Sequence, residues 1–152
     1  MTEVRFYHLT QSPLEHTLPG LLAKSLERGW RVIVQGGDEA RLAFLDTHLW
    51  TYADNSFLPH GLEGGGAAQP IWLTTSEANP NNAGVLMLID GARATPERMA
   101  TFDLVTLFFD GANQDAVATA RGDWKAVTDA GLPAVYWAQE NGGWTQKAKS
   151  SG

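Results

Sequence analysis

Two cations and one tryptophan fall at helical spacing in the stretch TARGDWKAV, residues 119–127. Arg121, Trp124 and Lys125 occupy positions i, i+3 and i+4, which share one face of an α-helix. An arginine can bind a carboxylate through two parallel hydrogen bonds, and an indole offers an apolar surface beside it. This face could therefore bind an acidic ligand with an apolar end. The alternative is a tryptophan half buried in the core and flanked by solvated charges, and the residue pattern leaves both interpretations open.

A second candidate contact surface is the aromatic stretch LWTYADNSFLPHG, residues 49–61. It brings Trp50, Phe57, Leu58 and Pro59 together in what we expect to be the end of a helix and a loop. Loops run over the protein surface, so we expect these clustered apolar side chains to pack either against the rest of the domain or against a partner. Either the rings fold back over the sheet, or Trp50 and Phe57 anchor a partner protein.

The motifs of common catalytic and cofactor sites are missing from this chain. It has no cysteine, which excludes disulfides, thiolate metal sites and cysteine nucleophiles. No H-E-x-x-H, G-x-S-x-G, G-x-G-x-x-G or phosphate-binding P-loop is present, and QGGDEAR places an acid where a phosphate would bind. Asp90 and Asp110 end apolar runs, but aspartates in such positions cap turns at least as often as they catalyse. We therefore expect no catalytic machinery, no metal and no cofactor.

The charge balance argues against a general DNA-binding surface, although a small local positive patch is still possible. The chain has 11 Lys+Arg against 17 Asp+Glu, a net charge of −6, whereas duplex binders present a basic stripe to the phosphates. Direct binding of single-stranded DNA by stacked tryptophans, of which there are 6, is disfavoured by the same charge. Without a basic leader or an apolar run of about 18 residues, we expect no membrane segment and a cytoplasmic location.

Apolar runs and helix signals alternate along the chain. Short apolar runs predict strands at 4–9, 31–35, 70–74, 85–90, 104–110 and 134–139. Helices are expected at 18–28 with Pro19 in the first turn, from a cap at Asp38 to Leu49, around 96–101, and at 114–130. This order predicts one α/β domain over residues 1–152 with a polar C-terminal tail from about residue 141. We expect a three-layer α/β/α sandwich with a mostly parallel central sheet, Rossmann-like but without a nucleotide fingerprint.

The chain resembles the chi subunit family of bacterial DNA polymerase III. The stretches that carry the resemblance are FYHL, GWRVIV, LDTHLWTYADNSFLPHG, PIWLT and ARGDWK followed by YW. They occur in the family's order and cover nearly the whole chain. The most specific part is LW…SFLPH followed at this distance by AR..WK.

The resemblance implies a non-catalytic adaptor that links the clamp-loader complex to single-stranded DNA-binding protein (SSB). Members of the family bind the acidic C-terminal tip of SSB, which ends in Asp-Asp-Ile-Pro-Phe or a close variant. They therefore contact DNA only indirectly, through SSB and the replisome at the nucleoid. The positions that match this site are Arg121, Trp124 and Lys125, with Phe109 as a further lining residue.

The resemblance also implies a second partner, the psi subunit or another clamp-loader or helicase protein. Its contact region matches Trp50 and Phe57 with the adjoining Leu58 and Pro59.

Two residues depart from a strongly basic peptide-binding helix. Gly122 costs about 1 kcal/mol of helix propensity relative to alanine, and Asp123 is expected to dilute the local positive field. We therefore expect weaker tail binding than a fully basic helix would give. The main alternative function is a nucleotide- or small-molecule-dependent enzyme of Rossmann-like architecture.

Overall fold

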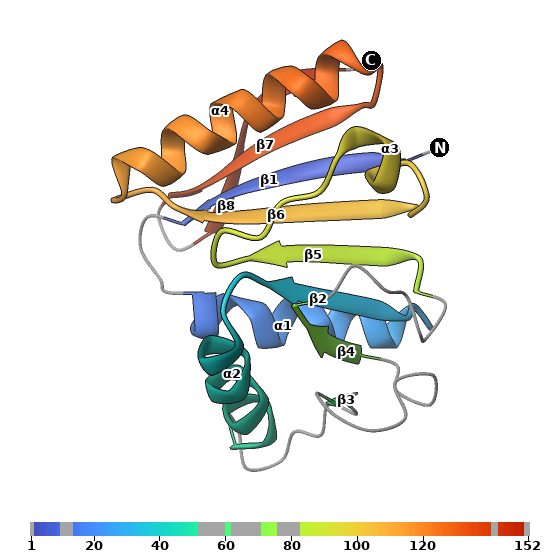
Figure 1. The fold of residues 1–152 in the computed structure, drawn as a ribbon, viewed down its shortest axis with the longest axis vertical. Helices are drawn as coiled ribbons and strands as arrows, with labels where there is room; N and C mark the ends of the chain where they lie inside the picture. The colour runs from blue at the N-terminus through green and yellow to red at the C-terminus, as the bar shows by residue number, and fades with distance from the viewer. Residues whose placement is uncertain are drawn as a thin grey trace.

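A mostly parallel sheet of eight strands organises the computed structural model, in the order β3-β4-β2-β5-β6-β1-β7-β8 (Figure 1). The structure describes residues 2–9, 14–51, 60–61, 71–75, 83–140 and 143–150. The strands are β1 (Glu3–Leu9), β2 (Val32–Gly36), β3 (His60–Gly61), β4 (Ile71–Thr74), β5 (Val85–Ile89), β6 (Leu104–Asp110), β7 (Ala134–Glu140) and β8 (Gly143–Ser150). The helices are α1 (Leu14–Glu27), α2 (Glu39–Thr51), α3 (Pro96–Met99) and α4 (Gln114–Asp129).

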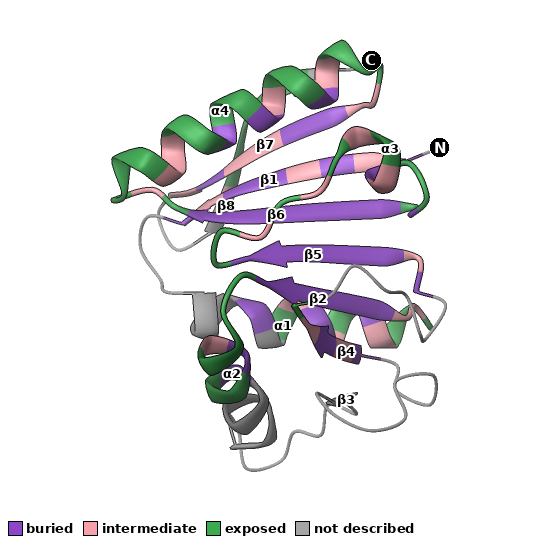
Figure 2. Cartoon of the chain, in the orientation of Figure 1, coloured by how far each residue is buried: buried purple, intermediate pink, exposed green. Residues whose placement is uncertain are grey.

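The centre of the sheet is buried on both faces. Every residue of β2 and of β5 is buried, and β6 is buried up to its last residue (Figure 2). Continuous apolar runs of this kind are typical of parallel strands covered by helices on both sides. Each neighbouring pair in the sheet is parallel except β7 and β8, which confirms the mostly parallel sheet.

Two apolar cores lie on opposite faces of the sheet. Leu22 of α1 and Leu45 of α2 belong to one core, and Met99 of α3 and Val127 of α4 belong to the other. The chain steps outward from β1 to β2 and β4, and steps back from β5 to β6 and β7. Since these parallel connections are right-handed, the two directions of travel place their helices on opposite faces. The predicted α/β/α sandwich is confirmed.

Local capping sets the helix ends. Asp38 accepts a hydrogen bond from the backbone N–H of Ala40 at 2.9 Å, as the predicted cap of α2 requires. Asn113 accepts from the N–H groups of Asp115 and Ala116 at 3.0 and 3.1 Å and so begins α4. Gly131, at φ 82°, follows the last residues of α4, where a left-handed conformation favours glycine.

Helix α1 begins earlier than the sequence predicts. Its first residue is Leu14 rather than Leu18, so Pro19 lies in the second turn instead of the first. Proline has no N–H to donate there, which weakens the helix. Leu18 and Leu22 are completely buried, and this packing against the sheet outweighs the local loss.

The polar segment after residue 141 contains a further strand. β8 pairs antiparallel with β7 at the edge of the sheet. Its residues Thr145 to Lys149 are exposed, while the ring of Trp144 lies 5.0 Å from that of Tyr7. Polar and lysine-rich composition is common in edge strands, because it discourages pairing with other chains. In the described part of the chain, no helix is long and apolar enough to cross a membrane.

Two neighbouring residues of α2 test how this helix packs. Leu45 is fully buried and Phe44 is 48% exposed, with the Arg41 guanidinium 5.2 Å from its ring. Leu45→Ala should lower the free energy of unfolding by about 2–5 kcal/mol, because it leaves a cavity. Phe44→Ala should lower it by about 1 kcal/mol or less. Urea unfolding measures both, and equal losses would contradict the placement of α2.

Candidate functional site

Helix α4 places the cationic and aromatic residues at the molecular surface. Ala120 and Val127 are buried against the sheet, which fixes the rotation of the helix. Arg121 and Lys125 are exposed, and Trp124 between them is partly buried. The structure therefore brings the three predicted residues together on one helix.

The indole of Trp124 is both a packing residue and a surface residue. Its ring lies 5.4 Å from the ring of Phe6 at 61°, and 6.2 Å from the ring of Tyr136 at 76°. Edge-to-face contacts of this kind are favourable and fix the orientation of the indole ring. The ring is therefore half buried and flanked by exposed cations, as the alternative interpretation expects, and binding of an acidic ligand on this face stays a prediction.

Tyr136 and His8 extend the aromatic surface, although residue spacing did not point to them. The phenol oxygen of Tyr136 lies 2.5 Å from Nδ1 of His8, and the two rings meet edge to face. Both lie on the α4 side, because Tyr136 is the register partner of Phe6 and His8 follows Phe6 by two residues. Strand alternation is the signal that could have found them.

Phe109 lies beneath the aromatic surface rather than on it. It is only 7% exposed, and its ring lies 5.0 Å from His8 and 5.9 Å from Tyr136. Phe109 thus supports the residues above it and offers little area of its own to a ligand.

The two exposed cations differ in their surroundings. Lys125 Nζ lies 3.8 Å from Asp129 Oδ2, and both side chains are at least 70% exposed. Such an exposed pair is weak and leaves the ammonium available to a ligand. Arg121 forms no ion pair within the described residues, and its charge acts on Tyr136. Burial raises the pKa of Tyr136, whereas the positive charge of Arg121 lowers it.

Asp123 does not dilute the positive field as the sequence suggests. It is 6% exposed and accepts hydrogen bonds from Arg93 Nε at 3.0 and 3.3 Å, with a further ion pair to Nη2. The hydrogen bonds and charge of Asp123 raise the pKa of Arg93. This carboxylate is therefore compensated locally, and it ties α4 to the segment before α3.

The second predicted surface lies mostly outside the described residues. Trp50 falls in the last turn of α2, where the backbone alone is described, and Phe57, Leu58 and Pro59 lie outside the described ranges. In the part of the chain that the structure describes, no group of three or more His, Asp or Glu side chains could hold a metal ion.

Comparisons with known proteins agree on one family. The model of the family described as DNA polymerase III chi subunit, HolC, matches residues 1–135. A probable DNA polymerase III subunit chi of Rickettsia prowazekii is 31% identical over 91 residues, 59% of this chain and 55% of the relative. The DNA polymerase III subunit chi of Pseudomonas aeruginosa is 30% identical over 90 residues, 57% of this chain and 63% of the relative. The matched part thus spans between half and two thirds of each relative.

The ionisation of Tyr136 tests the position of Arg121. Arg121→Ala should raise the pKa of Tyr136 further, because the cation that stabilises the phenolate is removed. Tyrosinate absorbance measures this, with Tyr136→Phe identifying the signal and Lys125→Ala as the control that leaves it unchanged. A lowered or unaltered pKa in Arg121→Ala would show that the two groups are not neighbours.

The same pKa shift predicts a loss of stability at alkaline pH. The folded-state pKa lies above the unfolded value of about 10, so the unfolded chain releases its proton first. The contribution of Tyr136 is therefore fully present below about pH 10 and is lost as the pH rises above it. Tyr136→Phe should show a smaller decline in unfolding free energy over that range.

Alanine substitutions at two glycines distinguish the effect of steric crowding on stability from the effect of helix propensity. A Cβ at Gly111 would lie 2.0 Å from His8 Nε2 and 2.9 Å from the carbonyl oxygen of Leu9, whereas one at Gly122 would meet nothing within 4 Å. Gly111→Ala should destabilise by about 1–3 kcal/mol or more, and Gly122→Ala should stabilise by about 1 kcal/mol. Thermal and urea unfolding measure whether each substitution raises or lowers the free energy of unfolding. An unchanged free energy of unfolding in Gly111→Ala would contradict the close approach of His8.

Proposed function

Because this chain belongs to the DNA polymerase III chi subunit family, we propose that it is a non-catalytic adaptor linking the clamp loader to SSB. In this proposal α4 binds the acidic C-terminal tail of SSB. The observation that carries the proposal is the exposed guanidinium of Arg121 beside the partly exposed ring of Trp124. Family membership favours this adaptor over the nucleotide-dependent enzyme.

The geometry of α4 matches the chemistry of the tail. Arg121 and Lys125 are one turn apart, so a terminal carboxylate between them would relieve the repulsion of like charges. The terminal phenylalanine would lie against Trp124 and Tyr136, which are already seated by Phe6 and Phe109. Preorganised rings lose little conformational freedom on binding, which favours affinity.

The layered fold supports simultaneous binding of two partners. We propose that Trp50, Phe57, Leu58 and Pro59 contact the psi subunit or another clamp-loader or helicase protein. Helix α2, which ends with Trp50 and Thr51, packs in the core on the other face of the sheet from α4. Figure 1 shows the two helices at opposite ends of the sheet. A protein bound at one end would therefore leave the other accessible.

Titration with the SSB tail peptide tests the proposal. We expect a dissociation constant on the order of micromolar, which corresponds to a binding free energy of about −8 kcal/mol. The affinity should fall as the salt concentration rises. Removal of the final phenylalanine should abolish most binding. Arg121→Ala should cost about 1.5–3 kcal/mol, because a charge-assisted hydrogen bond is lost.

The matched control is Lys149→Ala, which removes an exposed cation of β8. It should leave the peptide affinity unchanged. Equal affinities for the intact and truncated peptides, or equal effects of Arg121→Ala and Lys149→Ala, would refute tail binding at α4.

A further inference from the structure

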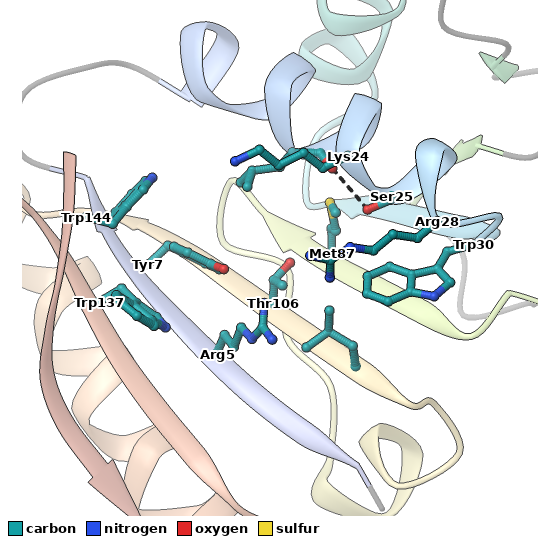
Figure 3. A pocket seen from close by; sticks show the side chains of 12 residues that line it. Arg5, Tyr7, Lys24, Ser25, Arg28, Trp30, Met87, Thr106, Trp137 and Trp144 are labelled. Carbon is teal, nitrogen blue, oxygen red and sulfur yellow. Dashed lines mark hydrogen bonds between the residues drawn. The ribbon is translucent and has the colours of Figure 1, made fainter. Parts of the chain in front are cut away.

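A pocket lies on the face of the sheet opposite to α4. It has a volume of about 240 Å³ and is lined by α1 and Trp30 on one side and by strands β5, β6, β1, β7 and β8 on the other (Figure 3). On this face α1 and α2 pack over β2, β4 and β5. The part of the sheet formed by β6, β1, β7 and β8 is only partly covered by helices on this face. Nothing in the proposed tail-binding site contributes to this pocket.

One wall of the pocket carries positive charge. Lys24 lies in the last turn of α1, and Arg28 follows the helix with its guanidinium 4.9 Å from the ring centre of Trp30. Both cations are exposed, and no carboxylate pairs with either among the described residues. A third cation, Arg5, is bound to Glu3 at 2.9 Å. Lys24 and Arg28 therefore supply the charge that a ligand anion would meet.

The opposite wall is aromatic. Tyr7 of β1 stacks on Phe108, with the ring centres 5.0 Å apart, and meets Trp144 of β8 edge to face. Trp137 of β7 is the register partner of Tyr7 and lines the same pocket. Figure 3 shows these rings on the side of the pocket opposite to Lys24 and Arg28. A ligand that is planar and apolar at one end and anionic at the other fits both walls.

Two buried polar atoms in this pocket lack partners. Thr106 Oγ1 and Trp137 Nε1 are buried, and neither has a hydrogen-bond partner within the described residues. Thr106 is only 3% exposed. A buried polar group left unpaired costs about 1–3 kcal/mol, so such groups are uncommon unless something else satisfies them. A ligand with hydrogen-bond acceptors on a flat edge would satisfy both.

We propose that this pocket binds a nucleotide. The base lies against Trp137 and Trp144, which the buried ring of Tyr7 supports, its edge accepts hydrogen bonds from Trp137 Nε1 and the Thr106 hydroxyl, and the phosphate lies near Lys24 and Arg28. Base edges offer carbonyl oxygens and ring nitrogens as acceptors, and every base has a face that stacks. An apolar peptide side chain would leave both buried polar atoms unpaired, which argues against a second peptide site.

The pocket is not the nucleotide crevice usual for open α/β sheets. That crevice lies beyond the carboxyl ends of the strands and depends on a glycine-rich turn. This pocket lies over the face of the sheet, and its β6 residues, Leu104 and Thr106, come from the first half of the strand. The missing glycine fingerprint therefore does not bear on it. The nucleotide is either free or one unit of a single-stranded nucleic acid.

Tryptophan fluorescence of the full chain tests the site. Deoxythymidine and deoxyadenosine monophosphates, a short oligothymidylate and inorganic phosphate are titrated separately. Thr106→Val preserves shape and removes the hydroxyl, so it should lower nucleotide affinity roughly tenfold without lowering the melting temperature. Trp137→Phe should also weaken binding. Lys24→Gln should reduce the salt dependence of oligonucleotide binding by about 0.7 in the log–log slope.

Matched variants separate this site from the proposed tail site. Lys125→Gln on α4 should leave nucleotide affinity unchanged, and Thr106→Val should leave affinity for the SSB tail peptide unchanged. Tighter binding of the oligothymidylate than of the monophosphates assigns single-stranded nucleic acid as the ligand, and equal binding assigns the free nucleotide. The proposal is overturned if no nucleotide saturates the signal, if inorganic phosphate binds as tightly, or if Thr106→Val binds nucleotide normally.

Discussion

The need to cover both faces of a buried parallel sheet governs the rest of this structure. β2 and β5 are buried throughout, so apolar side chains point from them into two separate cores. Right-handed connections then send α1 and α2 to one face and α3 and α4 to the other. Both surfaces discussed above follow from this arrangement. Helix α4 seals its face with Ala120 and Val127 and presents Arg121 outward, whereas α1 leaves part of its own face open as a pocket.

Local charge compensation explains how an acidic chain can present basic surfaces. The net charge is −6, yet the one acid buried in α4, Asp123, is bound to Arg93 and its charge is balanced there. Lys24 and Arg28 likewise have no carboxylate partner among the described residues. At physiological ionic strength, charges are screened over about 8 Å, so a ligand close to these cations responds to them more than to the net charge. Affinity at both sites would thus depend on contact rather than on long-range attraction.

The two proposed sites lie back to back across the sheet. Phe6 and Tyr7 are adjacent in β1, and the first packs against Trp124 while the second lines the pocket. One strand therefore supports both surfaces without joining them, because alternate side chains point to opposite faces. This separation would let the two proposed ligands, a protein tail and a nucleotide, bind at the same time.

Local patterns determined the elements of this protein, and long-range contacts decided its sites. The sequence by itself predicted the strand runs, the cap at Asp38 and the exposed face of α4, because each depends on periodicity or on hydrogen bonds between near neighbours. Only the tertiary structure could pair His8 with Tyr136, 128 residues apart, or Arg93 with Asp123, 30 residues apart. The start of α1, the pairing of β8 with β7 and the unpartnered Thr106 were also decided there. In each case the deciding energy comes from packing or hydrogen bonds between segments that spacing along the chain does not relate.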